Sequence, residues 1–210
     1  MESNKRSKLV DQVPSKPSFA HAIETAYRNF LFRSRLEAKY AAFFDLCGWP
    51  WSYEPKDYGG WIPDFAIGTT ATLVEVKPFF HEEQWDETVS KIIASGCREP
   101  VILLGADPTW NLERRITGQT APQFGEFLLE YFDRGDRVLG MRWDLHFGVT
   151  AKNGLLGLCM MDGGWWNPIW DFNEDDATVR LDYRDCEKIL VTRWAKAHNA
   201  SRWMKVKHEN

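Results

Sequence analysis

Three carboxylates and one lysine in the first half of the chain have residue types and spacing that suit metal-ion chemistry. They are Glu37, Asp64, Glu75 and Lys77. Burying such charges costs free energy unless each one meets a partner. Carboxylate oxygens that converge on one point are the ligands that Mg²⁺ and Mn²⁺ prefer, and these ions keep several of their waters. We therefore expect the four residues to form one site if the fold brings them together.

The sequence around these residues predicts a helix followed by three strands at hairpin spacing. Apolar residues from Leu36 to Cys47 recur at helical intervals. Ser34 is a suitable cap for the start of this helix, and Gly48 is a suitable stop. The expected strands follow at 51–53, 61–67 and 73–77.

The alternation of side chains along a strand decides which charges can meet. Glu75 and Lys77 are two residues apart, so they share one face of the third strand. Asp64 lies within the second strand, and it can approach Glu75 if the two strands pair. Glu37 lies at the edge of the helix's apolar stripe, so its carboxylate leans toward the core.

Ordinary structural roles stay open for each residue. Glu37 follows Ser34 by three residues and can be the acid of a capping box. Asp64 can cap a turn, and Glu75 with Lys77 can form a solvated strand face. All four positions must be accidental if no site exists, so their occurrence together favours a site.

The same residues resemble a known nuclease motif. Asp64, preceded by Pro63 and followed by the triplet Glu75-Val76-Lys77, resembles the PD-(D/E)xK motif. A helix that begins RSRLE and supplies Glu37 is also typical of that superfamily. The layout of residues 28–104 is similar to phage endonuclease I-type resolvases and to transposon and phage endonucleases. The resemblance implies an α/β fold with a restriction-endonuclease-like core (helix, three strands, helix, strand) and an elaborated α+β second half.

The resemblance also implies an activity. It implies a metal-dependent DNA endonuclease that hydrolyses phosphodiester bonds with Mg²⁺ or Mn²⁺, leaving 5′-phosphate and 3′-hydroxyl ends. Asp64 and Glu75 would hold the metal, and Glu37 would hold a metal-bound water or a second metal. Lys77 would orient or activate the attacking water and offset charge in the transition state. Selectivity for a DNA structure stays open, although no Gln-x-x-x-Tyr typical of some exonuclease relatives follows Lys77.

The charge distribution is more informative about DNA than the net charge of −4. Both ends of the chain are basic and the middle is acidic, and residues 188–208 contain six Lys or Arg and no acid. Basic ends can hold phosphates on either side of a metal site. A solvated tail is the alternative for the last residues. The residues that we expect to contact DNA are Arg33, Arg35, Lys91, Arg202, Lys205 and Lys207.

The predicted organisation is a flexible basic N-terminus and one nuclease-like domain. The N-terminus covers 1–18 and the domain 19–210, with its core at about 28–104 and an elaboration at 105–210. Residues 19–32 have helical character and would carry Arg28 and Arg33 toward the site. Further predicted helices cover 82–95, 123–132 and 185 to about 204; further strands cover 101–104, 138 onward and 154–161; and 163–170 is a loop that could face substrate.

The remaining expectations concern compartment and partners. Four scattered cysteines without CxxC spacing predict reduced thiols in a cytoplasmic protein. No apolar run has membrane length and no signal-peptide core is present, so we expect no membrane partner. A homodimer or a partner subunit of a phage or transposon complex is compatible with the resemblance. The alternative function is a non-catalytic DNA-binding or assembly subunit that keeps the nuclease fold.

Overall fold

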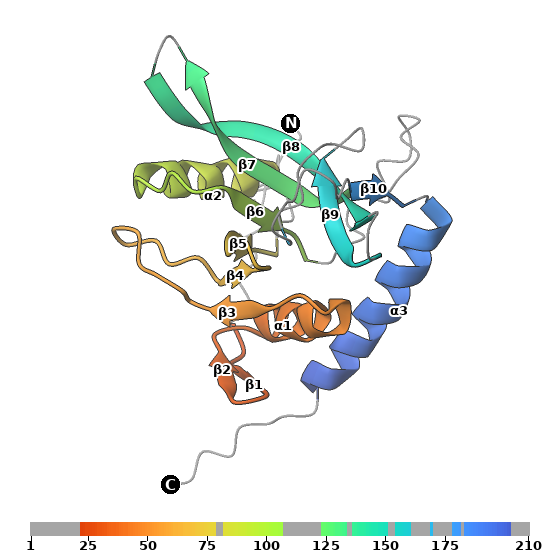
Figure 1. The fold of residues 1–210 in the computed structure, drawn as a ribbon. Helices are drawn as coiled ribbons and strands as arrows, with labels where there is room; N and C mark the ends of the chain where they lie inside the picture. Colours follow the sequence, from red (N-terminus) through yellow and green to blue (C-terminus); the bar gives the residue numbers. More distant parts are fainter. Residues whose placement is uncertain are drawn as a thin grey trace, which may run out of the picture.

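A computed structural model of the 210-residue chain shows a mixed α/β fold. It describes residues 22–78, 82–106, 123–133, 136–150, 154–160, 169, 178–181 and 183–202. The elements within these ranges follow in the order β1 (Thr25–Tyr27), β2 (Phe30–Phe32), α1 (Arg35–Cys47), β3 (Trp51–Tyr53), β4 (Phe65–Ile67), β5 (Thr72–Val76), α2 (Glu82–Ala94), β6 (Val101–Leu104), β7 (Gln123–Asp133), β8 (Asp136–Thr150), β9 (Leu156–Met160), β10 (Thr178–Arg180) and α3 (Tyr183–Arg202) (Figure 1).

One eight-stranded sheet joins the two halves of the chain. Its order is β10-β8-β7-β6-β5-β4-β3, with β9 paired to β8. β5 and β6 run parallel, and α2 connects them, as parallel strands require a crossover. The predicted order of helix, three strands, helix and strand is present as α1, β3, β4, β5, α2 and β6. The second half extends this sheet through the long hairpin of β7 and β8.

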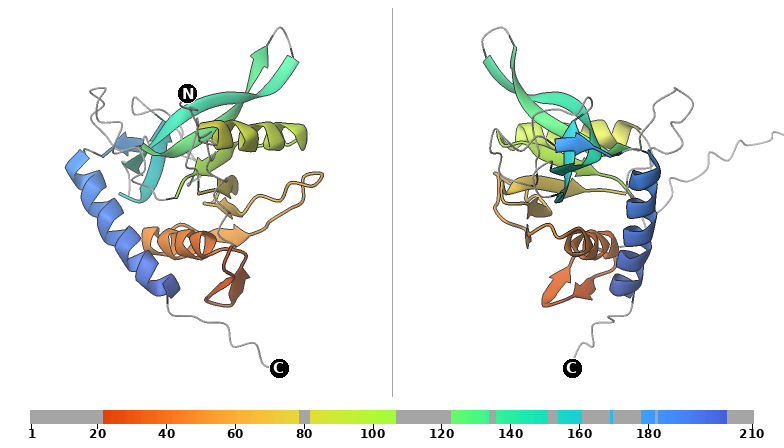
Figure 2. Two further views of the ribbon diagram at one scale, coloured as in Figure 1. Left: turned by 180° about the vertical axis from the view of Figure 1, so that it is seen from behind. Right: turned by 45° about the vertical axis from the view of Figure 1, so that its right-hand side comes forward.

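Helices cover both faces of the sheet. α1 and α3 lie side by side on one face, and α2 lies on the other (Figures 1 and 2). The alternation along β5 matches this layering, because Val74 and Val76 join the core under α1 while Leu73 joins the core under α2. The predicted division of β5 into two faces is therefore confirmed.

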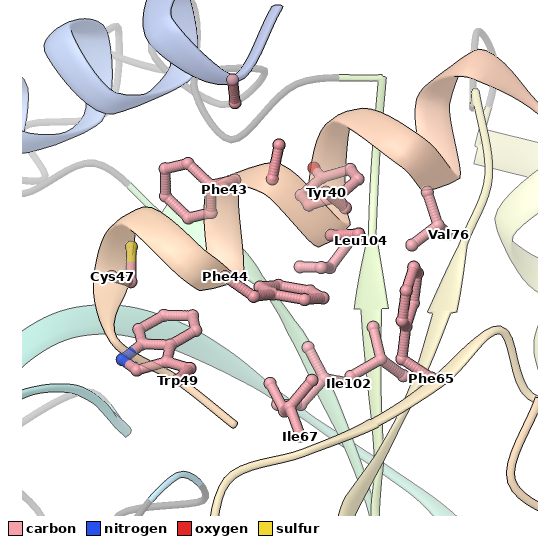
Figure 3. Close-up of a cluster of buried hydrophobic side chains, with 14 of the residues drawn as sticks. Tyr40, Phe43, Phe44, Cys47, Trp49, Phe65, Ile67, Val76, Ile102 and Leu104 are labelled. Carbon is pink, nitrogen blue, oxygen red and sulfur yellow. The ribbon is translucent and has the colours of Figure 1, made fainter. Parts of the chain in front are cut away.

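Aromatic side chains dominate the core between α1 and the sheet. Phe44 projects from α1 toward the strands, and Phe43 lies on the side of α1 that faces α3 (Figure 3). Phe44 meets Phe65 of β4 edge-on, with ring centroids 5.3 Å apart. Trp194 of α3 packs on Tyr40 at 4.8 Å. This core fixes the orientation of α1, and with it the position of Glu37 in the first helical turn.

Both predicted ends of α1 are confirmed. The Ser34 hydroxyl accepts a hydrogen bond from the backbone N–H of Glu37 at 3.1 Å, as an N-cap does. Gly48 adopts φ +74°, a left-handed conformation that glycine tolerates without steric cost. Its N–H bonds the carbonyl of Asp45, and the N–H of Trp49 bonds that of Phe44.

The predicted helix at 123–132 is wrong, because these residues form β7. Their apolar side chains recur at three- and four-residue intervals, which favours a helix when the segment is considered alone. Pairing with β6 on one side and β8 on the other overrides that local preference. Gly125 allows the close approach to β6, since a Cβ at this position would lie 2.6 Å from the carbonyl oxygen of Leu103.

The predicted helical segment at 19–32 is also wrong over the residues that the structure describes. Residues 25–32 form the β1–β2 hairpin. Arg28 lies in its turn and pairs with Asp45 at 2.9 Å, so it does not reach the predicted site. Aromatic packing explains the hairpin, because Phe32 lies edge-on to Tyr53 with centroids 4.6 Å apart.

Other expectations have mixed outcomes. The strand from residue 138 and its hairpin partner are confirmed as β8 and β9, while α3 begins two residues before the predicted cap Asp185. The strand predicted at 61–67 shortens to β4. All four cysteines are free and buried. No helix in the described part of the chain is both long and apolar enough to span a bilayer. The segment 1–18 and all of 163–170 except Ile169 lie outside the described residues.

Candidate functional site

Asp64 lies directly before β4, opposite Glu75 of the adjacent strand β5. The β4–β5 register pairs Phe65 with Val74, so the next residues outward are Asp64 and Glu75. Both acids are almost fully buried, at 1% and 2% exposure. Oδ2 of Asp64 accepts a hydrogen bond from the backbone N–H of Val76 at 2.8 Å. The sheet thus holds two carboxylates close together in a largely apolar layer.

Lys77 follows β5 and contacts the Glu75 carboxylate. Its Nζ lies 2.7 Å from Oε1 of Glu75, and its side chain stays 43% exposed. Oε2 of Glu75 accepts a hydrogen bond from the indole Nε1 of the buried Trp61 at 3.0 Å. Glu75 is therefore fixed from both sides, while the ammonium group of Lys77 reaches solvent.

Glu37 reaches the same region from the first turn of α1. Its side chain is 7% exposed, so it is not merely a surface capping acid. Oε1 accepts from the Ser34 hydroxyl at 2.7 Å, and Oε2 accepts from the Tyr53 hydroxyl at 2.6 Å. Burial and the hydrogen bond to Glu37 raise the pKa of Tyr53, so this hydroxyl stays protonated and acts as a donor.

Arg33 links the Glu37 and Asp64 sides of the site. Its Nη2 lies 3.1 Å from Oδ1 of Asp64, and its Nε lies 2.7 Å from Oε1 of Glu54. Its backbone N–H donates to the hydroxyl of Tyr53 at 3.1 Å. The side chain is 54% exposed, so the guanidinium bridges a buried carboxylate and the surface.

The four predicted residues influence one another electrostatically. Burial, then the Glu75 carboxylate, raise the pKa of Asp64 to about 7, against the opposing effect of Lys77. Burial lowers the pKa of Lys77, but Asp64, Glu75 and Glu37 raise it by more, and the net shift is upward. The site therefore combines crowded negative charge with a lysine that stays cationic.

The donor chemistry of Asp64 and Glu75 fits Mg²⁺ or Mn²⁺. Hard oxygen ligands suit these ions, and Mg²⁺ is commonly held by one or two carboxylates with waters. Among the described residues, no three His, Cys, Asp or Glu side chains lie close enough to form a metal-binding group. The structure thus offers a two-carboxylate set, and a ligand role for Glu37 stays a prediction. Each oxygen of that set contacts a protein donor, and Arg33 and Lys77 would compete with a metal for two of these oxygens.

The other predicted DNA contacts are more scattered. Arg35 is exposed at the start of α1. Lys91 is exposed on α2 and lines a small cavity of about 170 Å³ beside Trp61, the residue that bonds Glu75. Arg202 ends α3, but its side chain is outside the described part, as are Lys205 and Lys207.

Three residues in direct contact with the site were missed by the sequence analysis. Tyr53 and Trp61 donate to Glu37 and Glu75, and Glu54 shares Arg33 with Asp64. Trp61 precedes Asp64 by three residues in a predicted strand, where an aromatic residue indicates packing rather than hydrogen bonding. Only the pairing of distant segments reveals these contacts.

Comparisons of the chain with protein-family models, with curated proteins and with solved structures gave no match. The assignment of a function consequently rests on the geometry and chemistry of this site.

Proposed function

We propose that the chain is a metal-dependent DNA endonuclease of the PD-(D/E)xK type, built on a restriction-endonuclease-like core. One observation carries the proposal: Asp64, directly before β4, and Glu75 of β5 are buried opposite each other, with Lys77 in contact with Glu75. Burying two neighbouring carboxylates costs free energy even when Arg33 and Lys77 contact them, because desolvation can exceed the gain from pairing. A divalent cation bound between the carboxylates and a phosphate would stabilise these two negative charges, which explains why they are placed together.

The residues of the chain have distinct roles in this proposal. Asp64 and Glu75 would hold Mg²⁺ or Mn²⁺, which when bound supplies Lewis-acid polarisation of a phosphate oxygen. Lys77 stays an ammonium because the carboxylates outweigh burial and raise its pKa. It would stabilise charge on the phosphate and orient or activate the attacking water. Water attacks phosphorus, the bond to the 3′-oxygen breaks, and one proton of the water ends on that oxygen, which leaves a 5′-phosphate and a 3′-hydroxyl.

Arg33 is the second partly exposed cation of the site, after Lys77. Its exposed guanidinium can move from the Asp64 carboxylate to a phosphate oxygen with little backbone change. The same hydrogen-bonding fork serves both partners, because carboxylate and phosphate present similar oxygen pairs. Arg33 would then release Asp64 as the substrate enters.

A non-catalytic DNA-binding or assembly subunit is the second candidate, and one observation favours it. All four oxygens of Asp64 and Glu75 already meet protein donors, a pattern that also suits a stable ionic cluster. Under this alternative the cluster holds β4 and β5 together and binds no metal.

The two candidates are separated by cleavage and metal binding measured together. Linear, nicked, branched and single-stranded DNA are incubated with the chain in Mg²⁺ or Mn²⁺, and metal affinity is measured by calorimetry without DNA. The nuclease proposal predicts cleavage that Asp64→Ala and Glu75→Ala abolish along with metal binding. Glu87→Ala removes an acid on α2, outside the carboxylate site, and should change neither. Metal binding that survives the double substitution of Asp64 and Glu75 contradicts the assignment, and DNA binding without metal affinity supports the assembly role.

A further inference from the structure

A second, cationic cavity lies along α3, away from the carboxylates. It has a volume of about 480 Å³ and is lined by Val149, Leu181, Asp185, Lys188, Ile189, Thr192, Arg193 and Lys196. Volumes of several hundred Å³ are typical of small-molecule sites. Among the described residues that line the cavity, three are cations and one is an acid, whereas the whole chain has a net charge of −4. Its charge therefore differs in sign from that of the molecule as a whole.

The cations lie on one face of α3. Lys188, Ile189, Thr192, Arg193 and Lys196 follow intervals of one, three, one and three residues, which places them along a single stripe. Within the described part of the chain, no acidic side chain forms an ion pair with the three cations. Their charge is consequently available to an anion.

Arg193 is the most informative of these cations. It is half-buried, and its Nη1 is shielded from solvent without a hydrogen-bond partner among the described residues. It lies beside the Cys47 thiol, whose pKa burial raises to about 12, so that thiol stays neutral and does not balance the charge. Among the described residues no acid neutralises Arg193, so its positive charge adds to the attraction of the cavity for an anion.

The floor of the cavity is apolar and firmly positioned. Leu181 and Ile189 pack against the main core, and Val149 belongs to β8. The N–H of Leu181 donates a hydrogen bond to the carbonyl of Phe147 at 3.0 Å, which attaches the floor of the cavity to the sheet. An anion that fits here should therefore combine a charged group for the cations with an organic group for the floor.

We propose that this cavity binds a nucleoside phosphate monoester, with its phosphate on Lys188, Arg193 and Lys196 and its nucleoside on Val149, Leu181 and Ile189. A phosphate dianion matches the excess of two positive charges over Asp185. The ligand is a free nucleotide or the phosphorylated end of a strand, because both present the same group.

The cavity is separate from the carboxylate site. Arg193 neighbours Cys47 in the last turn of α1, whereas Glu37 lies in the first turn. Ten residues of helix separate these positions, a rise of about 15 Å. Binding in the cavity therefore needs no metal and does not depend on the proposed nuclease activity.

Calorimetry on the full chain in EDTA tests the proposal, because EDTA prevents metal-dependent binding at the carboxylates. The probes are deoxyadenosine 5′-monophosphate, deoxyadenosine, inorganic phosphate and a 5′-phosphorylated tetranucleotide. We expect the monophosphate to bind at least about tenfold more tightly than either of its separate parts, since both halves of the cavity contribute. Comparable binding of the tetranucleotide identifies a strand end as a ligand, and its absence identifies the free nucleotide.

Matched substitutions on α3 locate the ligand. The double variant Lys188→Gln/Lys196→Gln removes two exposed cations and should weaken monophosphate binding about tenfold or more. Arg184→Gln removes an exposed cation of the same helix outside the cavity and should change affinity less than twofold. Equal losses in both variants, binding of phosphate alone as tightly as the nucleotide, or no nucleotide binding at millimolar concentration would each overturn the proposal. Loss of binding in Lys77→Ala would place the ligand at the carboxylates instead.

Discussion

At the scale of single residues, the site is organised by competition for two buried carboxylates. Arg33 and Lys77 contact the oxygens of Asp64 and Glu75 that a metal would need. Both cations are about half exposed, so each can exchange its carboxylate for phosphate or water. The sequence predicted Lys77 in this position, and it placed Arg33 toward the site as a DNA contact. The structure shows that Arg33 also contacts Oδ1 of Asp64, so it competes with a metal for that oxygen.

Arg33→Gln should increase the affinity for Mg²⁺. The substitution removes a cation that competes for Asp64, and a half-exposed ion pair of this kind contributes up to about 1 kcal/mol, or about fivefold in affinity. Calorimetry at pH 8.5 measures the effect. Arg28→Gln is the matched control, because Arg28 pairs with Asp45 outside the site. Unchanged or weaker metal binding in Arg33→Gln would contradict this competition.

Asp64→Asn should stabilise the metal-free protein more at pH 8.5 than at pH 5. The pKa of Asp64 is about 7 in the folded chain and 3.8 in the reference state, so the folded state binds more protons between these values. Stability from this group therefore falls as pH rises from about 4 to 7 and stays reduced above that range. Asparagine lacks the buried charge and avoids the loss.

Urea unfolding at the two pH values measures this difference. Asp57→Asn provides a control at an exposed carboxylate. A stability gain for Asp64→Asn that is equal at pH 5 and pH 8.5 would show that burial of the ionised carboxylate is not costly in this fold.

At the scale of elements, local signals were sufficient where a segment's own residues set its structure. The helical spacing from Leu36 to Cys47, with Ser34 and Gly48 at its ends, predicted α1 almost to the residue. The alternation of β5 predicted that Glu75 and Lys77 share a face. Residues 123–132 show where prediction from local spacing fails. Their apolar residues have helical spacing, but pairing with β6 and β8 makes them a strand. The contacts of Tyr53 and Trp61 were unpredictable for the same reason.

Gly68→Ala tests how the turn between β4 and β5 connects to the second half of the chain. Gly68 has φ +75°, and a Cβ there would lie 2.0 Å from the carbonyl oxygen of Ile169. The neighbouring N–H of Thr69 bonds that same oxygen at 2.7 Å, so the backbone cannot simply withdraw. We expect a loss of about 3 kcal/mol or more in the free energy of unfolding.

Gly96→Ala is the matched control for this turn. Gly96 has φ +74° but no atom within 4 Å of a new Cβ, so only backbone strain of about 1 kcal/mol applies. Equal losses in the two variants, measured by urea unfolding, would show that the contact with Ile169 does not constrain the turn.

At the scale of the whole molecule, the second half of the chain supports the first in two ways. β7 continues the sheet beyond β6, and α3 lies beside α1, where Trp194 packs on Tyr40 (Figure 2). The sequence predicted α3 but gave no indication that it would pack on α1 or line a cationic cavity. Such packing depends on contacts between residues as distant in the chain as Tyr40 and Trp194.

Removal of residues 203–210 should weaken DNA binding without unfolding the chain. Ser201 is buried and bonded to Ala197, so a truncation must leave α3 intact through Arg202. If Lys205 and Lys207 each neutralise one phosphate, the slope of log affinity against log salt on duplex DNA should become shallower by about 0.9 for each lysine that the truncation removes. The full-length variant Lys205→Gln/Lys207→Gln should reproduce the change. An unchanged slope in both proteins would show that the tail does not bind DNA.

The central claim, that the buried carboxylates and Lys77 form a catalytic site, is tested most directly by single-turnover cleavage with Lys77→Ala. Lys77 contacts Glu75 but is not a proposed metal ligand, so its loss separates chemistry from metal binding. We expect a cleavage rate about 10²–10³ lower than that of the wild type, with Mg²⁺ affinity unchanged or tighter. Lys56→Ala, at an exposed lysine paired with Glu99, should cleave at the wild-type rate. Cleavage by Lys77→Ala at the wild-type rate would contradict the account.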